Sequence, residues 1–282
     1  MIKRLWRWLG IAVAGLVAAG LVALGIAYVV SERIRQRQWV VPTATVAVPT
    51  DAASIEEGRR LATVRGCFAG CHGQDAAGAV MFDDPLIARV VAPNLTAAVR
   101  KYSAAELTAI IRAGVRPDGR STVVMPAEVY ATLSDADLGR IIAFLRSLPV
   151  LDGPGPDVRL GPLGRIGLAV GQFKMTAQQI AEVVPPPQAE GEVASNGRYL
   201  ARTICAQCHG PSLRGYSTPD FTGPSLGVVI AYPEDAFSAL LKTGVAIGGR
   251  SLGVMGPWAR SNLSHLTDPE IAALYSYLHT MQ

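Results

Sequence analysis

Cysteine and histidine are scarce in this chain. Its 282 residues include four of each, and all four cysteines belong to two short segments, 67–72 and 205–209. A structural zinc site needs four ligands, but each segment supplies only two cysteines and one histidine. Neither segment can hold zinc alone, and a single zinc site shared by the two segments remains an open alternative.

Positive charge is also scarce once the N-terminus is set aside. The whole chain has a net charge of +4, whereas residues 1–41 contain six basic residues and one acidic residue. Residues 42–282 therefore carry a net charge of −1. This distribution excludes nucleic acid as a partner, because a binding face would need its basic residues on the folded part. Half of all residues are hydrophobic, which predicts a packed core.

Charge is absent altogether from residues 9–30. A helix of these 22 residues would be about 33 Å long, close to the roughly 30 Å hydrocarbon core of a bilayer. We therefore expect an uncleaved transmembrane anchor within residues 1–30 and a tether over residues 31–53. A long, cleaved signal sequence is the alternative. Basic residues flank the apolar segment on both sides, so charge alone leaves its orientation open.

The remainder of the chain contains an internal repeat. Residues 58–62 (GRRLA) and 197–201 (GRYLA) lead into the two cysteine segments. Residues 102–125 and 232–255 then align over 24 positions that begin with Tyr and end with Met. Two copies of one domain explain this pattern.

The repeat predicts the domain organisation. The first copy covers residues 54–150 and the second covers residues 191–282. Residues 151–190 between them are rich in proline and glycine, which is typical of a linker. Within this linker residues 166–173 are apolar, and we expect them to pack on one or both domains.

Both copies are predicted to be helical, so the fold class is all-α: a transmembrane helix followed by two tandem helical domains. Capping-box patterns occur at Ser54–Glu57, Ser103–Glu106 and Thr267–Glu270. Apolar residues at positions 138, 141, 142, 145 and 148 recur at helical spacing. No segment combines strict alternation with β-branched residues in a way that demands a sheet.

The second cysteine segment reads Cys205-Ala206-Gln207-Cys208-His209, which is the attachment motif of a c-type haem. Two thioether bonds from one backbone turn reach two vinyl groups on one porphyrin edge, and the adjoining histidine reaches the iron. A Cys-x-x-Cys disulfide would have no use for the histidine, and a thioredoxin-like motif would need a βαβ context that is absent.

Met125 and Met255 are the predicted distal ligands, because each ends the same repeated segment and lies just before a proline. Thioether ligation opposite histidine raises the reduction potential of a haem. Simple core packing is the alternative role for each methionine.

The carbonyl of Pro93 or Pro224 could fix the tautomer of the proximal histidine, or these prolines could merely form turns. We interpret His265 and His279 as exposed helix-end residues, with His265 or His279 replacing Met255 as a remote alternative.

Residues 54–150 and 191–282 each resemble a class I c-type cytochrome domain. The whole chain resembles the membrane-anchored members of the mono/dihaem cytochrome c group, most closely at Met125-Pro126 and residues 133–149. It is also similar to the cytochrome subunits of periplasmic alcohol and aldehyde dehydrogenases, which typically carry more haem sites. The resemblance implies haem loading outside the cytoplasmic membrane. The N-terminus would then lie inside and the haem domains on the periplasmic side of a bacterial inner membrane.

The first segment departs from the motif, since Cys67 and Cys71 are separated by three residues. Gly66 and Gly70 flank the extra residue and tolerate unusual backbone angles. We expect both cysteines to bind haem, with His72 and Met125 as axial ligands. The prediction is therefore two covalently attached haem c groups.

The predicted function is one-electron transfer rather than catalysis, because two irons with His and Met ligands have no free site for a substrate. Electrons would pass from a periplasmic dehydrogenase or quinol-oxidising complex to a terminal oxidase or soluble cytochrome, and the identity of these redox partners is open. The alternative is a dihaem redox enzyme of the peroxidase or thiosulfate-oxidising type. Such an enzyme needs an exchangeable axial site or a cysteine ligand, and no spare cysteine exists.

Overall fold

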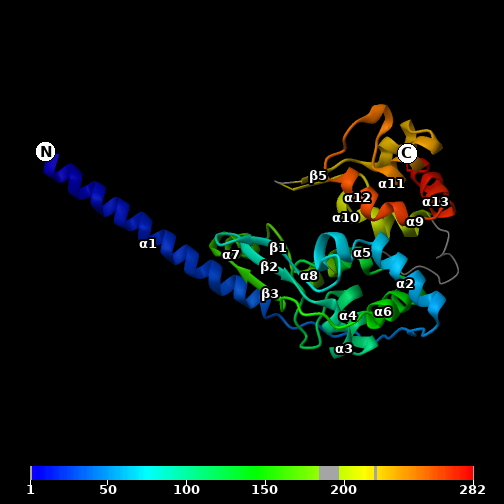
Figure 1. Ribbon diagram of the computed structural model, residues 1–282. Helices are drawn as coiled ribbons and strands as arrows, with labels where there is room; N and C mark the ends of the chain where they lie inside the picture. Colours follow the sequence, from blue (N-terminus) through cyan, green and yellow to red (C-terminus); the bar gives the residue numbers. More distant parts are fainter. Residues whose placement is uncertain (1, 184–196, 219–220, 282) are drawn as a thin grey trace.

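The computed structural model describes residues 2–183, 197–218 and 221–281. A long helix, α1 (Ile2–Arg35), projects from the rest of the molecule (Figure 1). Within the described residues it is the one helix that is long and apolar enough to cross a membrane. The helix continues past the expected end of the anchor at residue 30. Its last turn is held by Glu32, which accepts hydrogen bonds from Arg35 and Gln36.

The first domain is built around two crossing helices. Its helical elements are α2 (Ala52–Val64), the π-helical turn η1 (Phe68–His72), α3 (Leu95–Lys101), α4 (Ala104–Ala113), α5 (Ala127–Tyr130) and α6 (Asp135–Ser147). Helix α2 packs on α6 at Gly58, where a Cβ atom would lie 2.0 Å from the carbonyl oxygen of Arg140. Only glycine permits this close approach, which explains the first residue of the GRRLA segment.

The second domain repeats this arrangement. Its helical elements are α9 (Gly197–Leu200), η3 (Ala201–Cys205), α10 (Ala206–His209), η4 (Leu226–Ala231), α11 (Glu234–Thr243), η5 (Ile247–Gly249), α12 (Met255–Ser261), η6 (Leu263–His265) and α13 (Asp268–His279). A Cβ atom on Gly197 would lie 1.9 Å from the carbonyl oxygen of Ala273 in α13. The repeated glycine therefore marks the same helix crossing in both copies.

The predicted helical class is confirmed, although two small sheets accompany the helices. Strands β1 (Ala79–Asp84), β2 (Ala88–Ala92) and β3 (Asp157–Leu160) form an antiparallel sheet in that order, and β4 (Tyr216–Thr218) pairs with β5 (Phe221–Gly223). The sequence did not predict them, because these strands are short and β2 is buried at nearly every position instead of alternating.

The predicted linker is largely structured. It supplies β3 to the first domain's sheet, then α7 (Pro162–Ala169) and α8 (Thr176–Val183). Helix α7, which includes the start of the linker's apolar part, packs chiefly on α1 (Figure 1). It also contacts the first domain, as expected, at β3 and at the turn between β1 and β2. Helix α8 lies against α4 and α5. The prediction of a domain boundary near residue 190 falls outside the described residues.

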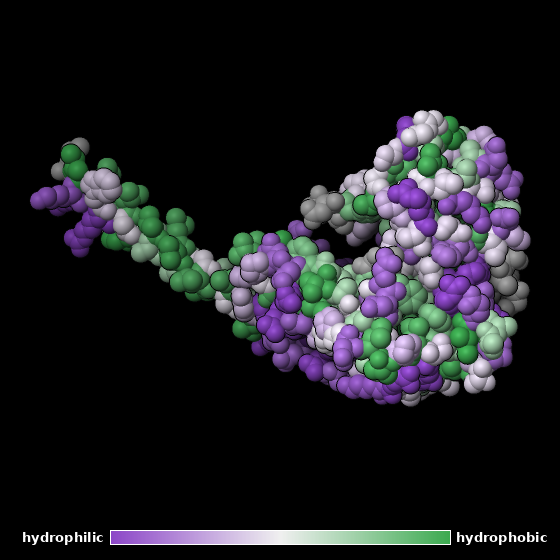
Figure 2. All heavy atoms as spheres, in the orientation of Figure 1, coloured by the Kyte–Doolittle hydropathy of each residue, from purple (hydrophilic) through white to green (hydrophobic). Residues whose placement is uncertain are grey.

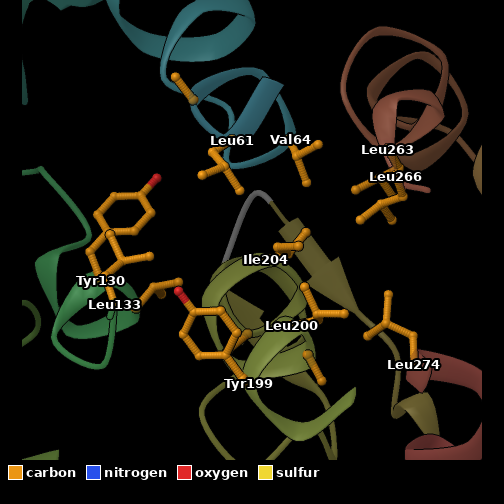
Figure 3. Close-up of a cluster of buried hydrophobic side chains, with 14 of the residues drawn as sticks. Leu61, Val64, Tyr130, Leu133, Tyr199, Leu200, Ile204, Leu263, Leu266 and Leu274 are labelled. Carbon is orange, nitrogen blue, oxygen red and sulfur yellow. The ribbon is translucent and has the colours of Figure 1, made fainter. Parts of the chain in front are cut away.

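The two domains share one hydrophobic core. Figure 3 shows Leu61, Val64, Tyr130 and Leu133 of the first domain near Tyr199, Ile204, Leu263 and Leu266 of the second, and all eight are buried in a single cluster. Trp258 of α12 packs over Gly66, where a Cβ atom would lie 2.2 Å from the indole ring. This continuous packing fixes the domains relative to one another.

A buried polar network crosses the same interface. Arg65, only 3% exposed, donates to Asp137 Oδ2 at 3.1 Å, and the Tyr199 hydroxyl donates to the same oxygen at 2.7 Å. The Tyr130 hydroxyl donates to the carbonyl of Arg65 at 2.8 Å. Asp137 thus balances a buried guanidinium charge between the two domains.

Replacing Asp137 with alanine should lower the free energy of unfolding by about 3–5 kcal/mol, because the buried Arg65 charge loses its partner. Asp135→Ala is the matched control, since Asp135 occupies the same helix turn and its side chain is 62% exposed in its ion pair with Arg112. The control should cost less than about 1 kcal/mol. Urea unfolding of the full chain in detergent, followed by circular dichroism, measures both. Equal losses would contradict the role given to Asp137.

A second ion pair joins α2 to α13. Arg60 donates to both carboxylate oxygens of Glu270, at 2.7 and 2.9 Å. Burial alone would raise the pKa of Glu270, but the hydrogen bonds from Arg60 and from the Thr267 backbone outweigh it and hold this pKa below the ordinary value. The charged carboxylate therefore stabilises the folded state at neutral pH.

We expect this contribution, about 1–2 kcal/mol, to be complete above the ordinary glutamate pKa of about 4.3. It should be lost as the pH falls through the lower pKa of folded Glu270. Glu270→Gln should therefore be less stable than the wild type at pH 7, and the difference should shrink below about pH 4. Unfolding measured across this pH range tests the expectation. A difference that stays constant down to pH 3 would contradict it.

Candidate haem-binding sites

A cavity of about 640 Å³ lies in the first domain. Cys67, Cys71 and His72 form part of its wall, and Met125 lies on the wall of the same cavity. The fold therefore brings together the four residues that the sequence predicted for the first haem site. Its surroundings are mainly apolar, with contributions from β2, α3, α4 and α6.

The extra residue between Cys67 and Cys71 is accommodated in a π-helical turn. Residues Phe68–His72 form this turn, and the amide of His72 donates to the carbonyl of Cys67 at 3.4 Å. A π-helical turn holds one more residue than an α-helical turn, so the cysteines stay on one local segment facing the cavity. Gly66 has a φ of +72°, which lets the chain leave α2 and enter this turn.

The two candidate proximal histidines are each hydrogen-bonded to a proline carbonyl, as one of the two readings of these prolines predicts. Nδ1 of His72 donates to the Pro93 carbonyl at 2.8 Å, and Nδ1 of His209 donates to the Pro224 carbonyl at 2.7 Å. Because a carbonyl only accepts hydrogen bonds, Nδ1 carries the proton and Nε2 is left bare for a metal. Burial lowers the pKa of both histidines, which keeps the rings neutral.

Met125 is held by the linker as well as by its own domain. The Thr176 hydroxyl of α8 donates to the Met125 carbonyl at 3.0 Å, and the Thr176 amide donates to the Thr122 carbonyl. Met81 and Met175 also line the cavity, and Met175 is 2% exposed. Sequence comparison of the two copies did not predict this placement, because neither methionine has a counterpart in the second copy.

The cavity also carries cationic side chains that sequence reasoning missed. Arg35, Lys101, Arg116 and Arg120 line it, and Arg35 comes from the end of α1. Two buried polar atoms on this wall have no hydrogen-bond partner in the structure, Nε of Arg65 and Oγ1 of Thr122. Nε of Arg116 makes no hydrogen bond either, but it lies 3.6 Å from Asp118 Oδ1. Such orphaned groups fit a ligand that presents acidic groups, as the propionates of haem do. The sequence feature that could have indicated these cationic side chains is Arg116, because the aligned position in the second copy is Ala246.

In the second copy the candidate ligands belong to three short helical elements. Cys205 ends η3, Cys208 and His209 belong to α10, and Met255 begins α12. His209 is buried, and Cys205 and Met255 pack against the shared core. Burial raises the pKa of Cys205, and separately that of Cys67, to about 12, so these thiols are protonated when free.

The rival uses of these residues find no support in the geometry. Neither pair of cysteines forms a disulfide. Among the residues that the structure describes, no group of three or more His, Cys, Asp or Glu side chains is placed to hold a metal ion. His265 lies exposed at a helix end, as expected. His279 also lies at a helix end, but it is half-buried instead of exposed, because its ring packs on Tyr275 and its Nδ1 donates to the Tyr275 carbonyl at 3.0 Å.

Comparison with known proteins agrees with this chemistry. Residues 194–282 match the family model described as cytochrome c, and residues 53–145 match the one described as cytochrome c oxidase, cbb3-type, subunit III. Each of the two domains thus matches a family model of c-type cytochromes. The resemblance noted in the sequence is thereby confirmed for the family, whereas the number of haem groups and the individual ligands remain predictions.

Three curated relatives extend across both cytochrome domains. The chain is 25% identical over 269 residues to the fructose dehydrogenase cytochrome subunit of Gluconobacter japonicus, which covers 85% of this chain and 55% of the relative. It is 25% identical over 277 residues to the alcohol dehydrogenase (quinone) cytochrome c subunits of Gluconacetobacter polyoxogenes and Komagataeibacter europaeus, covering 85% of this chain and 58% of each. This cytochrome thus spans little more than half the length of these relatives.

Proposed function

We propose that this cytochrome binds two covalently attached haem c groups and carries single electrons at the surface of a bacterial inner membrane. The observation that carries the proposal is the first-domain cavity, which Cys67, Cys71, His72 and Met125 all line. The matching motif Cys205-x-x-Cys208-His209 with Met255 supports a second site in the second domain.

Each residue type has a distinct task in these sites. Haem c, when bound, supplies an iron that gains and loses one electron. Cys67 and Cys71, like Cys205 and Cys208, would anchor the porphyrin through thioether bonds. His72 and His209 present Nε2 to the metal because their Nδ1 atoms are fixed by Pro93 and Pro224. Met125 and Met255 would complete the axial sets and raise the potentials.

The fixed domain interface favours transfer between the two sites. Gly66, next to Cys67, packs under Trp258 of α12, the helix that begins with Met255. On the other side of the interface, α5, which begins two residues after Met125, contacts η3, which ends at Cys205. Residues next to the candidate ligands of the first site thus contact residues next to the candidate ligands of the second site.

The alternative function is a dihaem redox enzyme with one exchangeable axial position. The anchoring of the Met125 loop by α8 favours the carrier, because a fixed ligand leaves no open coordination site. Low-spin optical and EPR spectra for both irons, without peroxide turnover, are the expected result. A high-spin signal from one iron together with peroxide reduction would favour the enzyme.

The relatives suggest the kind of partner. They are named as cytochrome subunits of fructose dehydrogenase and of quinone alcohol dehydrogenase, so we propose a membrane-bound dehydrogenase or quinol-oxidising complex as the donor. A terminal oxidase or soluble cytochrome would be the acceptor. The haem domains would lie on the periplasmic side, with the N-terminus inside. Affinity purification of the full chain from solubilised membranes, followed by substrate-driven reduction of its haems, tests this proposal; no co-purifying redox protein and no reduction would contradict it.

A further inference from the structure

Helix α7 is fastened to the last turns of α1. Arg165 donates to Glu32 at 2.9 Å and to the Ser31 hydroxyl at 3.2 Å, and its guanidinium lies 4.7 Å from the centre of the Tyr28 ring. Ala27 and Ser31 are buried, whereas most of α1 before them is exposed. The attachment therefore occurs where the apolar span of residues 9–30 ends.

Helix α7 and the residue before it are also hydrogen-bonded to the turn between β1 and β2. The amide of Leu163 donates to the Leu86 carbonyl at 2.9 Å, and the amide of Gly161 donates to the Ile87 carbonyl at 2.9 Å. Asp84 is partly buried and accepts hydrogen bonds from the amides of Leu86 and Ile87. The turn and α7 thus form one rigid unit next to the anchor, as their positions in Figure 1 also show.

The outer side of this unit is apolar and exposed. We define the anchor patch as five side chains with these exposed fractions: Leu86 57%, Ile87 46%, Leu163 54%, Ile166 37% and Val170 68%. In Figure 2 hydrophobic surface continues from α1 onto the adjoining part of the first domain. The nearest charge on α7, that of Arg165, is ion-paired with Glu32, which also pairs with Arg35. A cluster of exposed apolar side chains marks an interaction surface, whereas single exposed apolar side chains are common on any protein surface.

We propose that the anchor patch inserts into the boundary between the lipid headgroups and acyl chains, so that the first cytochrome domain rests on the bilayer. This inference rests on the proposed membrane anchoring of α1. A bilayer is the occupant that the position favours, because the patch is joined to Tyr28, Ser31 and Glu32, at the level where α1 leaves the hydrocarbon core. A partner protein that covered the patch would have to displace lipid, because the patch lies at the depth of the headgroup region.

One consequence concerns the first haem site. Glu32, Arg35 and Gln36 at the end of α1 line its cavity. Seating the patch in the bilayer would hold this cavity beside the membrane surface. The first domain would then be the one placed to exchange electrons with a membrane-embedded partner, and the second domain would face a soluble one.

Depth measurement in a bilayer tests the proposal. The full chain is reconstituted in nanodiscs of phosphatidylcholine and phosphatidylglycerol, with a spin label at Ile87→Cys, Leu163→Cys or Ile166→Cys. Ile247→Cys in the second domain is the matched control, because Ile247 is 44% exposed. Leu16→Cys, in the middle of α1, reports whether the anchor itself is inserted. The EPR readout compares label accessibility to oxygen with accessibility to a water-soluble nickel chelate.

Labels in the anchor patch should be about tenfold less accessible to the chelate than the label at Ile247, and more accessible to oxygen. The Leu16 label should be shielded from the chelate as well. If the patch labels match Ile247 while Leu16 is shielded, the bilayer contact is refuted and the proposed anchoring stands. If Leu16 is also accessible to the chelate, the anchoring fails and this inference fails with it.

Discussion

Replacing Cys205 and Cys208 with alanine is expected to halve the haem content of the purified chain. Without thioether bonds the second domain would release its haem under denaturing conditions, whereas Cys67 and Cys71 would retain theirs. Haem bound per chain is measured from the pyridine haemochrome spectrum after acidified solvent extraction. The reciprocal variant, Cys67→Ala with Cys71→Ala, should leave one haem in the second domain.

Because the two domains share a core, loss of one haem could disturb the other domain. Circular dichroism of each variant therefore accompanies the haem measurement. The single variant Cys67→Ala adds a sharper test of the π-helical turn, since one remaining thioether should shift the haemochrome band to longer wavelength with haem content unchanged. Unaltered haem content in both double variants would contradict covalent attachment at these cysteines. An unshifted band in Cys67→Ala would show that Cys67 is not bonded.

Met125→Ala is expected to lower the midpoint potential of the first haem, on the order of 0.1 V or more, because axial ligands set haem potentials over a wide range. Loss of the Met125 sulfur ligand should also open the iron to cyanide or carbon monoxide. Met255→Ala should have the same effect on the second haem. Spectroelectrochemical titration of the full chain measures both midpoints, and ligand binding is followed optically.

Met175→Ala provides the matched control, because Met175 lines the same cavity and is more deeply buried than Met125. Its replacement should cost about 2–5 kcal/mol of stability through the cavity it leaves. The potential should change little and no ligand should bind. The opposite pattern, with the potential and ligand binding altered in Met175→Ala and unaltered in Met125→Ala, would assign the axial position to Met175.

The features that the sequence predicted correctly are those encoded locally. The apolar segment 9–30 lies within a long exposed helix, and the capping boxes at Ser103 and Thr267 form as expected. The third box does not form, because Asp51 caps α2 by accepting from the Ser54 amide and the helix begins two residues before Ser54. Asp and Ser are comparable caps, so propensity alone could not choose between them.

The features that the sequence missed depend on contacts between distant segments. Strand β3 pairs with β2 across more than sixty residues, and nothing in residues 157–160 indicates that partner. The cavity's cationic side chains come from α1, α3 and the loop after α4, so no single segment shows them as a cluster. The choice of Asp137 as the partner of Arg65 likewise follows from the packing of α2 on α6 and of the second domain on both.

The repeat itself was predictable because close packing restricts residue choice. Gly58 and Gly197 are required at equivalent helix crossings, and the carbonyls of Pro93 and Pro224 face the two histidines in the same way. The repeated residues therefore reflect one domain design used twice. The differences lie where the first domain contacts α1 and the linker, which have no equivalent in the second domain.

Intact mass spectrometry of the purified full chain under denaturing conditions tests the account most directly. Unfolding removes every non-covalent cofactor, so only thioether-bonded haem adds to the mass of the polypeptide. The expected result is the polypeptide mass plus two haems, with one haem on a peptide containing Cys67 and Cys71 and the other on a peptide containing Cys205 and Cys208. A mass equal to the polypeptide alone, or to the polypeptide plus a single haem, would contradict it.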